Sequence, residues 1–242
     1  FIRYNRYDET GDVRKMDNQG NMLLLTILAV LFLVGGVGYL LIKYRRTNAM
    51  NQAIKQKDYE KILELCEQDR YKKILGPLVC DLYRFNALRS LGRIDELKQA
   101  LDTAVQLYGG RDLEKILELY YHYFLNHGDH TYAQELLNDI RDTRNEPFIL
   151  CSEWSYQVIA QGRNDLFNDM EDAINNDTFK GASLGTVLYL MGLQLEKDND
   201  LEQAKGYFET ATQCFLPSAI YMTLCHRHMD AIDAQMDRLD EE

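Results

Sequence analysis

The sequence contains few of the residues that interrupt regular structure. It has three prolines and 15 glycines among 242 residues, whereas 46% of the residues are hydrophobic and 27% are charged. A chain of this composition is not intrinsically disordered as a whole. Its length is that of one large domain or two small ones.

The motifs that mark common catalytic and nucleotide-binding sites are also missing. The sequence has no G-x-x-x-x-G-K-[ST] loop, no G-x-G-x-x-G after a strand pattern, no G-x-S-x-G and no histidine pair spaced as in H-E-x-x-H. In the cluster from Cys225 to Asp230, only His226 and Asp230 share a helical face at a spacing of four. We therefore expect no enzyme activity, no cofactor, no metal and no small-molecule substrate. A small helical hydrolase or metal enzyme is the least favoured alternative.

Cysteines are few and unpaired in the sequence. There are five, an odd number, and none forms C-x-x-C. An exported domain more often carries paired cysteines, so a reducing compartment is favoured. One sequon, Asn176-Asp177-Thr178, points weakly to export, but such triplets are frequent by chance.

One stretch contains no charge at all. Residues 22–42 read MLLLTILAVLFLVGGVGYLLI. A helix of this length spans about 31 Å, and the hydrocarbon core of a bilayer is roughly 30 Å thick. A cleaved signal peptide would have a shorter apolar core that ends at a small-residue site, and no such site precedes Lys43. We predict a transmembrane helix at 22–42 that is not cleaved.

Basic residues suggest the orientation of this span. Six lie within about 20 residues after it and four before it, and those nearest the span follow it, beginning with Lys43, Arg45 and Arg46. This distribution favours a cytoplasmic carboxyl-terminal body. The chain begins at Phe1, and a start at Met16 or Met22 would remove the preceding basic residues and strengthen that assignment.

The remainder of the chain is strongly acidic. Residues 47–242 contain 20 basic and 34 acidic residues, a formal charge of −14. Such a charge argues against nucleic acid or an anionic lipid surface as the main partner of the body.

From residue 47 onward, apolar residues recur at helical spacings with short polar interruptions. The interruptions themselves recur at steps of 35, 36, 34 and 37 residues. They are Lys57-Asp58-Tyr59, Gly92-Arg93-Ile94, Gly128-Asp129-His130, Gly162-Arg163-Asn164 and Asn199-Asp200-Leu201. A period near 34 is typical of stacked helix-turn-helix units, each of which needs its neighbours to bury an apolar face. We also expect the helix Thr47–Lys57 to continue directly from the membrane span, because no proline or glycine intervenes.

The last unit resembles the tetratricopeptide repeat (TPR) family. Its first helix carries Met191-Gly192 and Leu195, and its second carries Leu201, Ala204, Phe208 and Ala211, with Pro217 near its end. In the fourth unit Phe167 stands where the family usually has alanine. The resemblance implies an all-α fold, in which a superhelix of about five helix pairs is followed by a capping helix that ends near His228.

In that family the first helix of each pair lines a groove that binds peptides. The resemblance places eight residues in such a groove: Asn51, Asn86, Arg89, Lys115, His122, Asn126, Tyr156 and Tyr189. A chaperone-binding clamp for acidic peptides is not expected. Thr47, Tyr83 and Leu119 replace three of its five polar positions.

These inferences divide the chain into four parts: an amino-terminal tail (1–21), a transmembrane helix (22–42), a TPR-like domain (43–232) and an acidic tail (233–242). The expected function is that of a single-pass, membrane-anchored scaffold or adaptor, which binds a protein or peptide at the cytoplasmic face. The alternative is an exported, membrane-tethered solenoid that assists protein translocation or folding.

Overall fold

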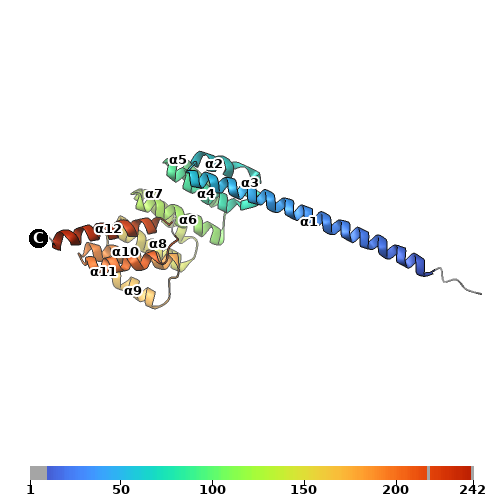
Figure 1. The fold of residues 1–242 in the computed structure, drawn as a ribbon. Helices are drawn as coiled ribbons and strands as arrows, with labels where there is room; N and C mark the ends of the chain where they lie inside the picture. The colour runs from blue at the N-terminus through green and yellow to red at the C-terminus, as the bar shows by residue number, and fades with distance from the viewer. Residues whose placement is uncertain (1–9, 217–218, 241–242) are drawn as a thin grey trace, which may run out of the picture. The chain divides into compact units, whose positions relative to one another are not determined.

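A computed structural model describes residues 10–216 and 219–240 (Figure 1). These residues form helices and turns, with no β-strand among them. The chain divides into two compact units, unit 1 (Phe1–Ala100) and unit 2 (Leu101–Glu242). The all-α fold class expected from the sequence is therefore confirmed.

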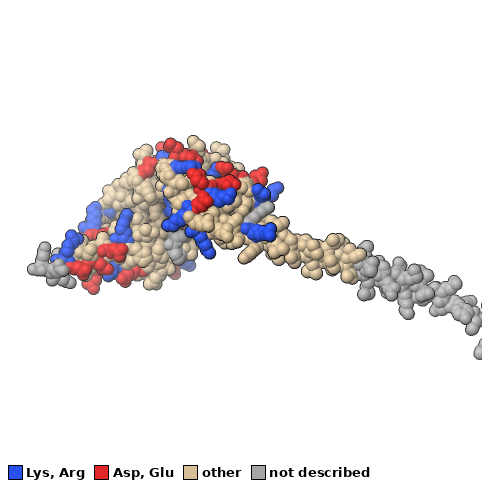
Figure 2. Space-filling view, turned by 45° about the horizontal axis from the view of Figure 1, so that its top comes forward, with Lys and Arg blue, Asp and Glu red and all other residues tan. Residues whose placement is uncertain are grey.

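Unit 1 begins with one long helix, α1 (Thr10–Gln56). Its segment Leu25–Ile42 is apolar and long enough to cross a membrane, and none of its side chains is buried. Figure 2 shows this segment as an uncharged surface. The expected continuity between the apolar segment and the following helix is confirmed, because α1 runs without interruption to Gln56.

The carboxyl-terminal end of α1 belongs to the core of unit 1. Three further helices complete this unit, α2 (Tyr59–Glu67), α3 (Asp69–Leu75) and α4 (Pro77–Leu91), followed by the first part of α5 (Ile94–Leu107). Met50 and Ala53 of α1 are buried together with residues of α2, α3 and α4. The apolar membrane-length segment and the unit 1 core thus share a single helix.

Unit 2 contains the remaining helices. They are α6 (Gly110–Asn126), α7 (His130–Arg141), α8 (Glu146–Ser155), the π-helical turn η1 (Tyr156–Ala160), α9 (Phe167–Asn175), α10 (Ala182–Lys197), α11 (Leu201–Thr212) and α12 (Ile220–Asp240). Its core is formed mainly where α10 packs against α8, α11 and α12.

The recurring interruptions adopt one backbone geometry. The first residue of each is left-handed, with φ between 55° and 83°, although two of the five are not glycine. In four of them the next N–H donates to the carbonyl five residues earlier, at 2.9–3.1 Å. The acceptors are Ala53, Leu88, Phe124 and Leu195. This bond closes the end of a helix, so the same helix-turn-helix junction occurs four times.

The fourth junction departs from this pattern. Its first helix ends in η1, and the Arg163 N–H donates to the Gln157 carbonyl six residues earlier. The Gln194 side chain accepts a hydrogen bond from the Leu166 N–H, and α9 begins only at Phe167. Met170, the fourth residue of α9, is fully buried, whereas Phe167 at its start is half-buried.

The last helix is longer than the sequence suggested. α12 continues past His228 to Asp240, so most of the expected acidic tail is helical. Ile232 is buried in the unit 2 core, and Asp233 forms an ion pair with Lys205 of α11 at 2.6 Å. Among the side chains of α12 that the structure describes, Ile232 is thus the last buried one, and between Asp233 and Arg238 the helix is mostly exposed.

Candidate binding site

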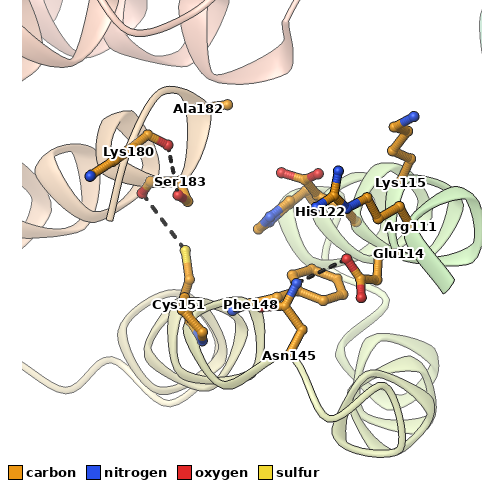
Figure 3. Close-up of a pocket in the computed structure, with 12 residues that line it drawn as sticks. Arg111, Glu114, Lys115, His122, Asn145, Phe148, Cys151, Lys180, Ala182 and Ser183 are labelled. Atoms are coloured by element: carbon orange, nitrogen blue, oxygen red, sulfur yellow. Dashed lines mark hydrogen bonds between the residues drawn. The ribbon is translucent and has the colours of Figure 1, made fainter. Parts of the chain in front are cut away.

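Unit 2 contains a pocket of about 360 Å³ between α6, α8 and the start of α10 (Figure 3). Basic, acidic and apolar side chains all line it. These are Arg111, Glu114, Lys115, Glu118, His122, Asn145, Pro147, Phe148, Cys151, Lys180, Ala182 and Ser183.

One face of α6 supplies five of the lining residues. Arg111, Lys115, Glu118 and His122 follow one another at spacings of three and four, which places their side chains in a row along the helix. The other faces of α6 are apolar and buried, with Ile116 and Leu117 among the fully buried residues. Burial of those faces therefore turns the charged row toward the pocket.

The two carboxylates of the pocket differ in their partners. Glu114 accepts a hydrogen bond from the Asn145 side chain at 2.9 Å. Glu118 is half-buried and makes no hydrogen bond or ion pair with any residue that the structure describes. Burial, and secondarily the negative charge of Glu114, raise the pKa of Glu118. Glu118 is thus a half-buried carboxyl group whose oxygens are accessible to water and have no protein partner among the described residues.

His122 forms the inner end of the row. Its side chain is only 6% exposed, and its Nδ1 atom is 2.7 Å from the Tyr221 hydroxyl of α12. Burial lowers the pKa of His122 to about 3. The imidazole is consequently neutral at physiological pH and hydrogen-bonded within the fold, a state that suits a structural role.

Cys151 contributes a buried thiol from α8. Its sulfur lies 3.9 Å from the Ser183 carbonyl oxygen, and burial raises the pKa of the thiol to about 12. A nucleophilic cysteine requires a lowered pKa, so this environment keeps Cys151 protonated and unreactive.

Five of the eight residues predicted to line a groove lie in unit 2. Lys115 and His122 line the pocket. Asn126 donates to the His122 carbonyl at 2.8 Å, and the buried Tyr189 ring lies 5.0 Å from that of Tyr221. Tyr156 lies apart, with its hydroxyl 3.1 Å from the Gln134 side chain. The structure therefore groups three of the five, His122, Asn126 and Tyr189, near Tyr221, and two of the five, Lys115 and His122, line the pocket.

The other three predicted residues lie in unit 1. Asn51 is exposed, Asn86 donates to the Leu82 carbonyl at 3.0 Å, and the Arg89 guanidinium lies 5.9 Å from the centre of the Phe85 ring. Each of these interactions is local to its own helix.

The two histidines of α12 differ in their surroundings, because one contacts α10 and the other faces solvent. The Nδ1 atom of His228 lies 2.7 Å from the Glu196 carboxylate, and its Nε2 atom lies 3.4 Å from the Tyr189 hydroxyl. His226 is exposed. Within residues 10–216 and 219–240, no three His, Cys, Asp or Glu side chains are grouped as metal ligands.

Comparison of the chain with known protein families, curated proteins and solved structures gives no match.

Proposed function

We propose that this chain is a membrane-anchored helical-repeat adaptor of the TPR type, which holds a protein partner at the cytoplasmic face of a membrane and catalyses no reaction. The observation that carries the binding role is the open pocket of unit 2, where Glu118 has no partner among the described residues. Open pockets with a few converging polar groups are the usual places for ligand binding.

The anchor is supported by α1. Water-facing helices rarely expose a continuous apolar surface, because each exposed apolar side chain has an unfavourable hydration free energy. The segment Leu25–Ile42 is exposed throughout and long enough to span the hydrocarbon core. A bilayer would remove this surface from water.

The repeat is supported by the close approach of α10 and α11. Gly192 lies against the Phe208 ring, so closely that a Cβ atom there would be 2.7 Å from the ring carbon Cε1. Ala204 and Ala211 of α11 are fully buried. Small residues facing a large aromatic side chain are the packing that the TPR resemblance implies for these positions.

A non-catalytic role is supported by the state of the two most reactive groups in the pocket. The pKa of His122 is shifted away from neutrality, to about 3, and that of Cys151 is raised to about 12. The pKa values of catalytic groups are normally shifted toward the pH at which the enzyme works.

A site-specific crosslinking experiment tests the adaptor role. A photoreactive benzoylphenylalanine at Lys115, which is exposed at the pocket, is expected to form a discrete covalent adduct with a partner protein in living cells. The matched control is the same residue at Glu209, which is exposed on α11 and does not line this pocket. Absence of an adduct at position 115, or equal adducts at both positions, would contradict the proposal.

The cysteines distinguish the cytoplasmic orientation from the exported alternative. Cys214 is half-buried, whereas the other four cysteines are buried. We expect a membrane-impermeant maleimide to leave Cys214 unlabelled in intact cells and to label it after permeabilisation, with Cys214→Ser as the control for the labelled site.

Two neighbouring cysteines of unit 1 provide a second test of the orientation. The buried thiols of Cys66 and Cys80 lie in the same unit 1 core, close enough for each to affect the pKa of the other. In a reducing cytoplasm both remain thiols, while an oxidising compartment favours a disulfide between such neighbours. A Cys66–Cys80 disulfide found by mass spectrometry after acid quenching, or labelling of Cys214 in intact cells, would favour export.

A further inference from the structure

We propose that unit 1 rests on the anionic lipid headgroups of the bilayer that α1 spans, through a surface made by α3 and the start of α4. This α3–α4 surface consists of Arg70, Lys72, Lys73, Pro77 and Val79. The inference rests on the membrane anchor of the proposed function and not on the adaptor role. It gives unit 1 a lipid partner of its own.

The path of the chain places α3 on the side of unit 1 that faces the apolar segment. The turn at Lys57-Asp58 reverses the chain after α1, and the Asp58 N–H donates to the Ala53 carbonyl at 2.9 Å. α2 therefore runs back along α1 for nine residues, about 13 Å, and α3 begins where α2 ends. Figure 1 shows α3 beside α1 at the point where α1 leaves the unit, and the two helices are in contact.

The outward side of α3 is basic. Arg70 and Lys73 are three residues apart, which puts them on one face of the helix, and both are exposed. The ammonium groups of Lys72 and Lys73 form no ion pair or hydrogen bond with any residue that the structure describes. Figure 2 shows further basic side chains where the uncharged part of α1 meets unit 1. Such groups attract the phosphates of anionic headgroups.

The carboxylates of this region do not cancel the basic charge. Glu67 lies 3.8 Å from the Arg84 guanidinium of α4. Asp81 is half-buried and lies near the two cysteines of the unit 1 core. Asp69, in the first turn of α3, is the remaining acidic neighbour. It stands against three basic side chains, so the surface keeps a net positive charge.

Exposed apolar side chains lie next to the basic ones. α3 ends before Gly76, and the exposed Pro77 opens α4. Val79, in the same first turn, is 38% exposed. Tyr44 is 70% exposed and lies two residues past the apolar segment, at the level where tyrosines border bilayers. A surface that combines basic and apolar side chains is typical of segments that lie in the headgroup layer.

The negative charge of the body does not oppose this contact. The formal charge of −14 on residues 47–242 argues against an anionic lipid surface as the main partner of the body. Residues 101–242, which form unit 2, contain 10 basic and 26 acidic residues, so they account for all of this excess. The argument therefore applies to unit 2 and not to unit 1.

Vesicles of two compositions test the inference with the full chain. Val79→Cys in a Cys214→Ser background carries an environment-sensitive nitrobenzoxadiazole (NBD) label, because the other four cysteines are buried. The chain is reconstituted into phosphatidylcholine alone or with about 30% phosphatidylglycerol. We expect the NBD emission to shift to shorter wavelength only in the anionic vesicles. The shift should disappear at about 1 M salt, where the Debye length is about 3 Å.

Lys72→Gln combined with Lys73→Gln removes two charges from the α3–α4 surface. Each substitution is expected to lower the ratio of docked to undocked unit 1, measured by the NBD emission, about fivefold. The matched control is Lys55→Gln combined with Lys57→Gln, two exposed lysines at the end of α1 farther from the apolar segment. Its expected effect is less than about twofold, because salt screens charges at that distance. Thermal unfolding verifies that both double variants fold.

Three results would overturn the inference: equal emission in the two kinds of vesicle, equal effects of the two double variants, or a shift that persists at high salt. Extraction with alkaline carbonate tests the anchor separately. If the chain resists extraction but its emission does not depend on the lipid, the anchor stands and the lipid contact is refuted. If carbonate extracts the chain, both are refuted. The adduct at position 115 tests the adaptor role independently of these outcomes.

Discussion

Replacing Gly192 by valine is expected to lower the free energy of unfolding by about 3 kcal/mol, at the upper end of what extra methyl groups cost in a packed core. A Cβ at position 192 would meet the Phe208 ring at 2.7 Å. The ring cannot move aside easily, because Phe208 is fully buried and stacks on His228 with ring centres 5.1 Å apart. For a chain of this size we expect a fall of about 10 °C in the unfolding temperature, measured by circular dichroism in detergent.

Gly206→Val is the matched control for this substitution. Gly206 also lies within a helix, α11, but nothing is within 4 Å of where its Cβ would be. Its replacement should change stability by no more than about 0.5 kcal/mol, because valine is a slightly better helix former than glycine. Adding Phe208→Leu to Gly192→Val should recover part of the loss. Equal effects of the two glycine substitutions would refute the close packing of α10 on α11.

The second large effect concerns acid stability and His122. Its pKa is about 3 in the folded chain, because the ring is buried, and about 6.5 in the unfolded chain. Between these values the unfolded state binds more protons, so stability falls as the pH decreases below about 6.5. From pH 7 to pH 5 the contribution of His122 amounts to a loss of about 2 kcal/mol. Denaturant unfolding at the two pH values measures it.

His122→Gln should remove this contribution while keeping an acceptor near the Tyr221 hydroxyl. The raised pKa values of Glu118 and Asp139 act in the opposite sense, because these groups take up protons more readily in the folded chain. The contributions of Glu118 and Asp139 are the same in the wild type and in His122→Gln to a first approximation. They therefore cancel when the two free energies of unfolding are subtracted. His226→Gln, at an exposed position on α12, is the control. If the free energy of unfolding of His122→Gln depends on pH in the same way as that of the wild type and of His226→Gln, the buried neutral state of His122 is refuted.

The junctions between helices could be predicted from sequence because their causes are local. Asp58, Asp129 and Asp200 each accept a hydrogen bond from a backbone N–H in the first turn of the following helix. Capping of this kind depends on residues three apart in the chain. The fourth junction differs from the others because its geometry depends on Gln194, 28 residues away from Leu166.

The pocket could not be predicted in the same way. The resemblance placed His122 and Tyr189 in a groove, but the structure buries both, because Tyr221 of α12 packs against them. His122 and Tyr221 are separated by 99 residues. No local pattern reports such a contact. The spacing of Arg111, Lys115, Glu118 and His122 was visible in the sequence, but not that α8 and α10 would face it.

The single helix α1 also limits how far the unit 1 core can stand from a bilayer. Only seven residues lie between Ile42, at the end of the apolar segment, and the buried Met50, a rise of about 12 Å along a helix. With Leu25–Ile42 in the bilayer, the start of the unit 1 core lies about 12 Å along the helix from the edge of the hydrocarbon core, close to the headgroup layer. Residues 47–100 contain ten basic and eight acidic side chains, whereas the excess of acidic residues lies in 101–242. Together with Lys43, Arg45 and Arg46, the part of the chain that follows the apolar segment is therefore basic, which favours anionic headgroups beside it.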